Sequence, residues 1–177
     1  MRPGIHFIER QKFYYNQEHG FRIAFPRKNW FASDYILRNY LKKAYHQGKE
    51  TQIPVVLVRK EFQDFYYENV NVVIYKRKQE HKNLDECLKA HIQDMKDTSL
   101  KIGVKWNCKD KATDPKTRAA ILEAYPVEKD GKTYCQLQRF IMGFKKIYIL
   151  TATFTPEDGE YFKKDLREIL NSFVLID

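Results

Sequence analysis

Three strand-like segments follow one another in the C-terminal half of the chain, separated by two short turns. They cover residues 118–127, 133–142 and 147–154 and are rich in apolar and aromatic residues. Asp130-Gly131 lies between the first two segments, and an Asp-Gly pair between apolar runs is a strong signal for a tight hairpin turn. Residues 143–146 form the second turn. This region constrains the fold more than any other, because it predicts an antiparallel β-meander.

A second hairpin is predicted near the N-terminus, over residues 12–26. Its two strands flank a polar turn over residues 16–20. In the second strand Phe21, Ile23 and Phe25 alternate with an Arg and an Ala. This alternation places the rings on one face of the strand, which we expect to be buried.

A helix is predicted after Asn83, on the basis of an apolar stripe at helical spacing. Asn83 can cap its first turn, and Glu86 can return a hydrogen bond to Asn83 as a capping box. We expect this helix to end near Asp97. The remaining strands are predicted over residues 55–60, 70–78 and 100–106.

Two further helices are predicted, one in the N-terminal part of the chain and one in the C-terminal part. One begins at Ser33 or Asp34 and is interpreted as a helical insertion over residues 33–47. The other begins at Thr155, a capping residue, with Pro156 at its first position. The buried side of this last helix is expected to consist of Phe162, Leu166, Ile169, Leu170 and Phe173.

The order of these elements predicts an α+β fold, in which an antiparallel β-sheet with a meander is flanked by helices as an α/β/α sandwich. We expect one domain over residues 1–177, with residues 1–11 as an N-terminal extension. Hydrophobic residues make up 43% of the chain and aromatic residues 15%, a composition that excludes a disordered protein. No stretch approaches the roughly 20 apolar residues of a transmembrane helix, so we expect a soluble protein with no transmembrane segment.

Several short matches resemble the Mog1/PsbP-like superfamily, including its small bacterial domains. The opening pairs an aromatic hairpin with Phe25-Pro26 and Trp30, and the middle helix begins Asn83-Leu84-Asp85-Glu86. The finish resembles the family in Thr155-Pro156, an amphipathic helix and Ser172-Phe173. The resemblance covers residues 13–173, and the helix over residues 33–47 looks like an insertion relative to it. It implies an antiparallel sheet flanked by helices and a protein-binding or assembly role without chemistry.

The charge of the chain favours anionic partners. Its net charge is +9 and its isoelectric point is about 9.3, values that suit nucleic acid, anionic lipid or an acidic protein face. The alternative is that the charge serves only solubility, with basic side chains scattered over the surface. The start of the chain lacks the pattern of a secretory signal, and the compartment stays open between cytoplasm and cell envelope.

Two groups of residues are candidates for partner binding. The first consists of basic clusters, above all Lys76, Arg77 and Lys78 at the end of a predicted strand. Further basic residues that can join them are Lys101, Lys105, Lys109, Lys111, Lys116, Arg118, Lys145 and Lys146. The second group lies in a predicted connection, where rings either cap the sheet or form an exposed patch: Phe62, Phe65, Tyr66 and Tyr67.

The sequence contains no pattern that commits it to catalysis. It lacks a Gly-x-Ser-x-Gly elbow, an HExxH motif, a P-loop and a Gly-x-Gly-x-x-Gly loop. Cys87 and His91 have a spacing that suits a metal, but no second ligand pair lies nearby, so we interpret them as a thiol and a hydrogen-bonded imidazole at the core edge. Three cysteines without a CxxC pair, which include Cys108 and Cys135, favour free thiols, and one disulfide with one free thiol is the alternative.

We therefore predict a non-enzymatic protein-binding or assembly module whose partner is another protein. No cofactor and no metal is expected. One alternative is an electrostatic binder of nucleic acid or another anionic partner through a basic face. A second alternative is a hydrolase whose site the sequence does not reveal.

Overall fold

A computed structural model describes most of the chain. It describes residues 4–8, 11–26, 28–33, 52–59, 68–78, 82–114, 116–127, 133–157 and 159–176. The predicted helix over residues 33–47, apart from Ser33, lies outside these residues. So do the predicted aromatic connection over residues 62–67 and the turn at Asp130-Gly131.

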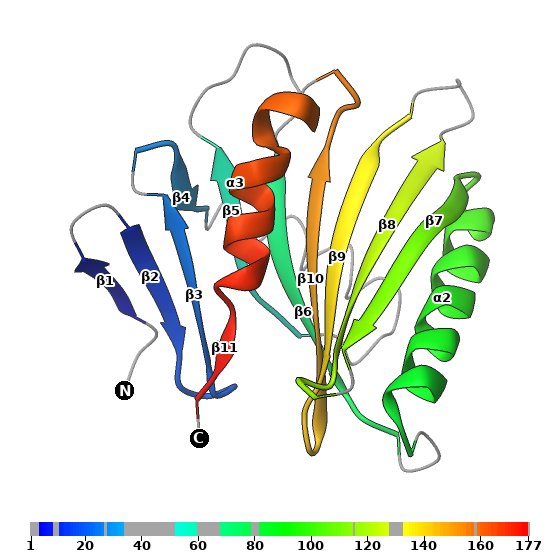
Figure 1. The fold of residues 1–177 in the computed structure, drawn as a ribbon, viewed down its shortest axis with the longest axis horizontal. Helices are drawn as coiled ribbons and strands as arrows, with labels where there is room; N and C mark the ends of the chain where they lie inside the picture. Colours follow the sequence, from blue (N-terminus) through cyan, green and yellow to red (C-terminus); the bar gives the residue numbers. More distant parts are fainter. Residues whose placement is uncertain are drawn as a thin grey trace.

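The larger sheet is antiparallel and has seven strands, in the order β4-β5-β6-β10-β9-β8-β7 (Figure 1). Strands β8, β9 and β10 pair in series, which confirms the predicted meander. The four-residue turn between the last two of them is closed by a hydrogen bond from the Gly143 N–H to the Lys146 carbonyl, 2.9 Å. The strands are β4 (Trp30–Ala32), β5 (Gln52–Arg59), β6 (Asn69–Lys76), β7 (Lys105–Asp114), β8 (Ala119–Val127), β9 (Cys135–Met142) and β10 (Lys146–Phe154).

The smaller sheet has four strands, in the order β1-β2-β3-β11. Its centre is the predicted N-terminal hairpin, which is confirmed. Its outer strands were not predicted: β1 falls in the segment interpreted as an N-terminal extension, and the two-residue β11 pairs with β3 across almost the whole chain. The strands are β1 (Gly4–Ile8), β2 (Gln11–Asn16), β3 (Phe21–Pro26) and β11 (Val174–Leu175).

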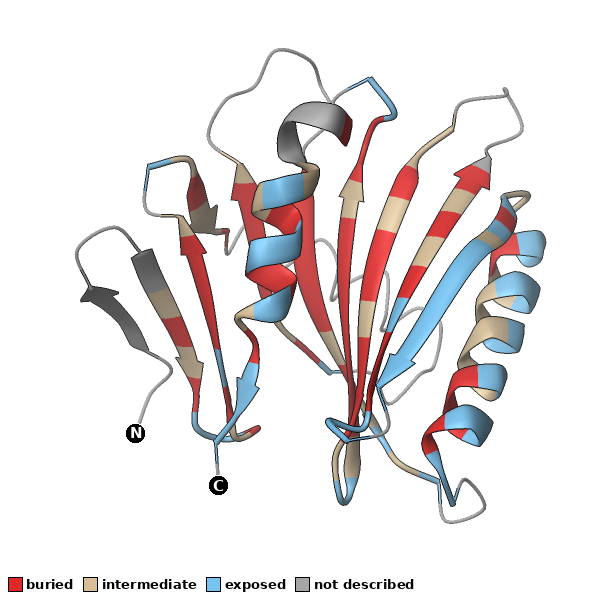
Figure 2. Ribbon diagram, in the orientation of Figure 1, coloured by how far each residue is buried: buried red, intermediate tan, exposed pale blue. Residues whose placement is uncertain are grey.

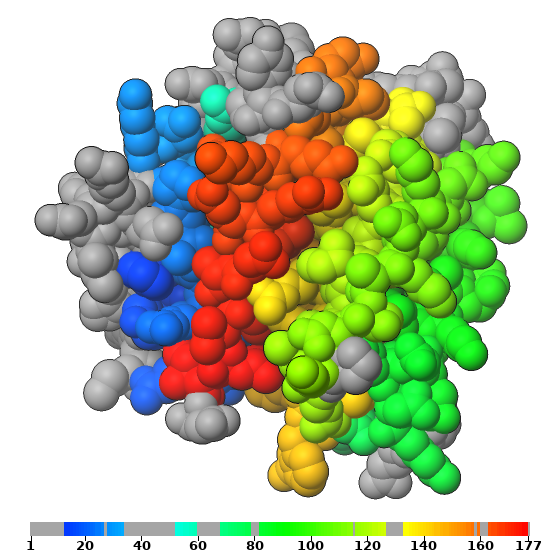
Figure 3. All heavy atoms as spheres, in the orientation of Figure 1, coloured from blue at the N-terminus to red at the C-terminus, as the bar shows by residue number. Residues whose placement is uncertain are grey.

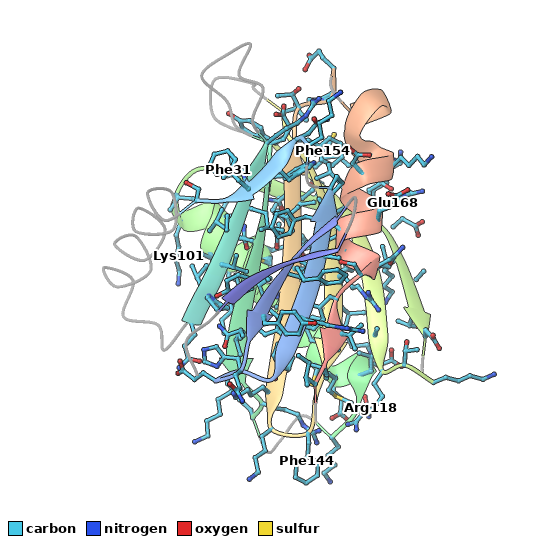
Figure 4. All side chains as sticks on the ribbon, turned by 90° about the vertical axis from the view of Figure 1, so that its left-hand side faces the viewer. Phe31, Lys101, Arg118, Phe144, Phe154 and Glu168 are labelled. Atoms are coloured by element: carbon cyan, nitrogen blue, oxygen red, sulfur yellow. The ribbon has the colours of Figure 1, made fainter. Side chains whose placement is uncertain are left out.

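Two helices lie on opposite faces of the larger sheet. Helix α3 (Gly159–Asn171) packs beside the smaller sheet on one face (Figures 1 and 3), and α2 (Leu84–Lys101) lies on the other. In Figure 4, Lys101 of α2 and Glu168 of α3 lie on opposite sides of the sheet. This arrangement confirms the α+β sandwich. Among the described residues, we find no helix that combines the length and the hydrophobicity of a membrane span.

The meander strands bury side chains on both faces (Figure 2), as strands covered on two sides should. Along β10, Tyr148 and Leu150 point into the core under α3, and Ile149 points into the core under α2. On the α3 side the rings of Phe21, Tyr148 and Phe173 meet, with centroids 5.0–6.3 Å apart. Aromatic rings therefore join the smaller sheet, the larger sheet and the end of the chain.

The start of α2 agrees with the prediction in position and differs in one hydrogen bond. Asn83 is the N-cap, and its side-chain oxygen accepts from the Glu86 N–H at 2.9 Å. The Glu86 carboxylate reaches past Asn83 and accepts from the Lys82 N–H, 2.7 Å, and from the Asn83 side-chain amide, 3.1 Å. These bonds hold the pKa of Glu86 below its usual value. Asn83 and Glu86 thus fix the first turn together.

The predicted end of α2 near Asp97 and the predicted strand over residues 100–106 are wrong. The helix continues to Lys101 and ends in a Schellman motif, in which Gly103 has φ +78°. Its N–H donates to the Leu100 carbonyl at 3.0 Å, and the Val104 N–H donates to the Ser99 carbonyl at 2.9 Å. The glycine was the signal for this boundary, because it takes the left-handed conformation without strain. Strand β7 starts only after it.

The last helix starts later than predicted. Pro156 and Glu157 form a turn, closed by the Gly159 N–H and the Pro156 carbonyl at 3.3 Å, and α3 begins at Gly159. A side chain at Gly159 would lie 3.1 Å from the Phe154 ring, so glycine lets strand and helix approach closely there. The predicted buried residues Leu166, Ile169, Leu170 and Phe173 are confirmed, and the side chain of Phe162 lies outside the described part.

Candidate anion-binding surface

Basic side chains from separate parts of the sequence meet at one end of the larger sheet. The end of β6 pairs with the start of β10, where Lys76 is the register partner of Lys146. The Arg77 N–H donates to the Lys145 carbonyl at 2.9 Å. The two basic clusters that the sequence placed about 70 residues apart are therefore neighbours.

The turn between β7 and β8 joins this end from the other side. The Met142 N–H donates to the Arg118 carbonyl at 2.9 Å, and Figure 4 shows Arg118 and Phe144 at the same end of the molecule. The first turn of α2 lies here too, because the Cys87 thiol is 3.6 Å from the Met142 sulfur. We call this set of residues the basic end: Lys76, Arg77, Lys78, Lys82, Lys116, Arg118, Lys145 and Lys146.

Phe144 stands at the tip of the turn between β9 and β10, with 82% of its surface exposed. The guanidinium of Arg77 donates to the carbonyls of Gly143 and Phe144, both at 3.4 Å. A side chain at Gly143 would lie 3.0 Å from the Lys146 carbonyl, so the turn is tight. The protein thus presents an aromatic ring on a braced turn, which protrudes at the lower edge of Figure 3.

The turn between β2 and β3 also lies at the basic end, where its residue His19 contacts Lys146. His19 is 8% exposed. Burial lowers the pKa of His19, and the adjacent charge of Lys146 lowers it further, while Glu18 opposes this. The imidazole is therefore neutral at neutral pH, and its Nδ1 accepts from the Lys146 ammonium at 3.3 Å. The His19 carbonyl accepts from the Tyr148 hydroxyl at 2.8 Å, which anchors the turn to β10.

Among the described residues of these segments, the acidic ones are fewer than the eight basic ones, and two of them are occupied by structural bonds; the acidic residues are Glu18, Asp85, Glu86 and Asp114. Asp114 accepts from the Thr117 hydroxyl at 2.8 Å and from the Lys116 N–H at 3.0 Å, bonds that lower its pKa. Glu86 is occupied at the start of α2. The basic side chains Lys76, Lys78 and Lys145 are exposed. The described residues of this surface therefore carry a net positive charge, which attracts an anionic partner.

Three of the other basic candidates, Lys101, Lys105 and Lys109, do not join this surface, and Lys111 lies within β7 opposite Leu122 of β8. Lys105 pairs with Val127, at the opposite end of β7, and Lys101 ends α2 just before it. Lys109 lies over the ring of Tyr125, 5.3 Å from its centroid. The predicted basic region after the second helix is therefore split between the two ends of the larger sheet.

The cysteines and His91 have structural surroundings. His91 Nε2 lies 3.0 Å from the Gln138 side-chain oxygen, and its ring packs against Phe140. Burial raises the pKa of the thiols of Cys87, Cys108 and Cys135, all of which are free. Among the described residues no group of His, Cys, Asp and Glu side chains has the geometry to hold a metal ion.

The sequence analysis did not identify one prominent residue of this surface, Phe144. Other candidates lie outside the described residues. Phe144 was treated as part of a turn, although an aromatic residue in a four-residue turn has no strand position from which to enter the core. That position was the available signal. The predicted partner-binding rings Phe62, Phe65, Tyr66 and Tyr67 lie outside the described residues, so their role stays a prediction.

Comparison with known proteins identifies the fold. No family model matches the chain, and no curated protein sequence matches it. The solution structure of cyanobacterial PsbP (CyanoP) from Synechocystis sp. PCC 6803 is similar with a TM-score of 0.68 and 14% identity, over 96% of this chain and 94% of that one. A protein of unknown function from Pseudomonas aeruginosa, PA94, a putative regulator by its description, has a TM-score of 0.53 and 12% identity over 96% and 99%. The resemblance predicted from the sequence is confirmed at the level of architecture: this chain has a PsbP-like fold.

Proposed function

We propose that this chain is a non-enzymatic binding or assembly module that docks on an anionic partner through the basic end. The observation that carries the proposal is the convergence of basic side chains from four separate segments around the exposed turn of Phe144. Such a surface steers an anionic partner by long-range attraction and binds it with a strong dependence on salt.

The titratable groups favour binding over catalysis. A thiol is a nucleophile only as the thiolate, and the raised pKa values keep the thiols of Cys87, Cys108 and Cys135 protonated. The Tyr125 hydroxyl donates to the Glu123 carboxylate at 2.5 Å. This bond lowers the pKa of Glu123 and raises that of Tyr125 to about 12. Neither group is adjusted to exchange protons near neutral pH, as a general acid or base requires.

A charge-reversal experiment tests the proposal. The variant Lys76→Glu/Lys78→Glu/Lys145→Glu changes the basic end, and Lys101→Glu/Lys105→Glu/Lys109→Glu changes the net charge equally elsewhere. We expect the first variant to elute from immobilised heparin at much lower salt than the second, and to lose partners captured from extract. Equal losses in both variants would show that only overall charge matters, and would refute a specific docking surface.

Nucleic acid is a second candidate for the partner, and one observation favours it. The exposed ring of Phe144 stands among lysines, the combination with which proteins bind single strands by stacking and charge. Nuclease treatment during the capture distinguishes the two candidates. Loss of the captured material on treatment would assign the basic end to nucleic acid, whereas a partner that survives nuclease would argue against it.

A further inference from the structure

Exposed apolar side chains of two segments lie near the basic end. Phe144 is 82% exposed, and Val174, Leu175 and Ile176 at the end of the chain are 37–44% exposed. Leu175 lies beside the turn of Phe144, because its Cδ1 would be 3.9 Å from a side chain placed at Gly143. We call these four residues the apolar edge.

The apolar edge is fixed in place by backbone hydrogen bonds. The Ile176 N–H donates to the Gly20 carbonyl at 2.8 Å, and Val174 pairs with Arg22 of β3. Arg77 braces the turn of Phe144 from the other side. Exposed apolar residues that occur singly are ordinary, but Leu175 and Phe144 come from distant parts of the chain and are held next to Gly143 beside a charged surface, and such a grouping marks an interaction site.

We propose that the basic end binds an anionic lipid surface, with Phe144 inserted among the acyl chains and the surrounding lysines and arginines at the headgroups. The inference rests on the proposed function and names its partner. Apolar side chains flanked by Lys and Arg are the composition of protein surfaces that lie in the membrane interface. Long basic side chains can keep their charge at the headgroups while their stems lie against acyl chains.

Shape favours a membrane over the other anionic partners. Phe144 lies at the tip of a protruding turn, which a fluid lipid surface accommodates without a fitted pocket. Nucleic acid can stack on one ring, but it offers no apolar surface for Val174, Leu175 and Ile176. Each basic side chain near an anionic leaflet adds to the attraction, so several of them together give measurable affinity.

Vesicle co-sedimentation tests the proposal with phosphatidylcholine vesicles and with vesicles that also contain phosphatidylserine. We expect binding only to the second kind, and loss of it at high salt. Phe144→Ala should weaken this binding roughly tenfold or more, because burying a phenyl ring in an apolar phase is strongly favourable. The matched control is Leu100→Ala at the far end of α2, where the side chain is 76% exposed, and it should bind as wild type.

Insertion can be observed directly with Phe144→Trp. Trp30 and Trp106 are 0% and 4% exposed, so the new indole would be the accessible one among the described residues. Its fluorescence should shift to the blue on phosphatidylserine vesicles and be quenched by lipids brominated on their acyl chains. An unchanged spectrum with bound vesicles would refute insertion.

The results separate this inference from the proposed function. Heparin retention that depends on the basic end, without binding to phosphatidylserine vesicles, would overturn the lipid partner and leave the anion-binding surface intact. Heparin retention that does not depend on the basic end would overturn both. Equal vesicle binding by wild type and Phe144→Ala would also overturn the lipid inference as stated.

Discussion

The two described helices are held to the same sheet in different ways. Helix α3 buries Leu166, Ile169 and Leu170 almost completely, and the Leu170 carbonyl accepts from the Arg139 guanidinium at 2.7 Å. Just beyond it, the Ser172 hydroxyl donates to the Ala24 carbonyl of β3 and accepts from the Ala24 N–H, both at 2.9 Å. Side chains and backbone groups from distant parts of the chain therefore fix this helix.

Helix α2 buries a smaller share of its described residues, although it is longer. Of its 18 residues only Leu84, Cys87, Leu88 and Ser99 are buried, and Leu100 is 76% exposed. Its ends, in contrast, are well formed, with a capped first turn and a Schellman motif. The comparison shows that α3 depends on tertiary packing and α2 depends more on local hydrogen bonds at its termini.

The largest difference between the helices is expected from truncation of a buried leucine. Leu166→Ala should lower the free energy of unfolding by about 2–5 kcal/mol, because it leaves a cavity between two sheets and a helix. Leu88→Ala in α2 should fall at the lower end of that range, since α2 lies near the margin of the sheet and can move inward. Denaturant unfolding measures both, and a larger loss for Leu88→Ala would contradict the comparison.

A smaller effect is expected at the C-terminal end of α2. Gly103→Ala places a side chain at φ +78° and should cost about 1–2 kcal/mol of stability. The exposed position Lys101 provides a control, because Lys101→Ala leaves the backbone conformation unchanged. If the two variants unfold at the same denaturant concentration, the Schellman motif does not stabilise α2.

The N-terminal cap of α2 should contribute to the free energy of unfolding about as much as Gly103 does, or slightly less. Asn83→Ala removes the acceptor for the Glu86 N–H and is expected to cost about 1 kcal/mol. Asn83→Ser should keep most of the stability, since serine also caps helices well. A thermal unfolding series on the three proteins would refute this account if serine and alanine behaved alike.

The smallest expected effect concerns pH on the α3 side. The folded-state pKa of His19 lies below its unfolded value of 6.5, so the unfolded chain binds this proton more readily. Above pH 6.5 the imidazole is neutral in both states, so His19 does not lower the free energy of unfolding. As the pH falls below 6.5, the unfolded chain takes up the proton first, and the free energy of unfolding decreases. His19→Gln should flatten this part of the curve of stability against pH. An identical slope in wild type and variant between pH 7 and 5 would contradict the burial of a neutral imidazole.

Local signals in the sequence predicted the elements that they specify physically. The meander and the N-terminal hairpin follow from alternating apolar residues and turn residues, and the start of α2 follows from Asn83. Errors arose where one local signal was overlooked, as at Gly103, or where no local signal exists. Strand β11 has only two residues, and its place is given by pairing with Arg22 and Phe21.

The candidate surface could be predicted only in pieces. Lys76-Arg77-Lys78 and Lys145-Lys146 were recognisable as basic clusters, and the sequence itself left open whether they meet. It also grouped Lys105 and Lys109 with Lys116 and Arg118, although β7 separates them along its length. A strand of ten residues is too long for its two ends to share one small surface.

The sequence by itself determined the strands of the meander, the N-terminal hairpin and the capped start of α2, because these depend on neighbours within a few residues. The tertiary structure decided the rest: the two sheets, the closing strand β11 and the gathering of basic turns around Phe144. Those features depend on pairings such as Lys76 with Lys146 and Val174 with Arg22. Residues so far apart leave no periodic trace in a sequence, and only their packing on a common sheet brings them together.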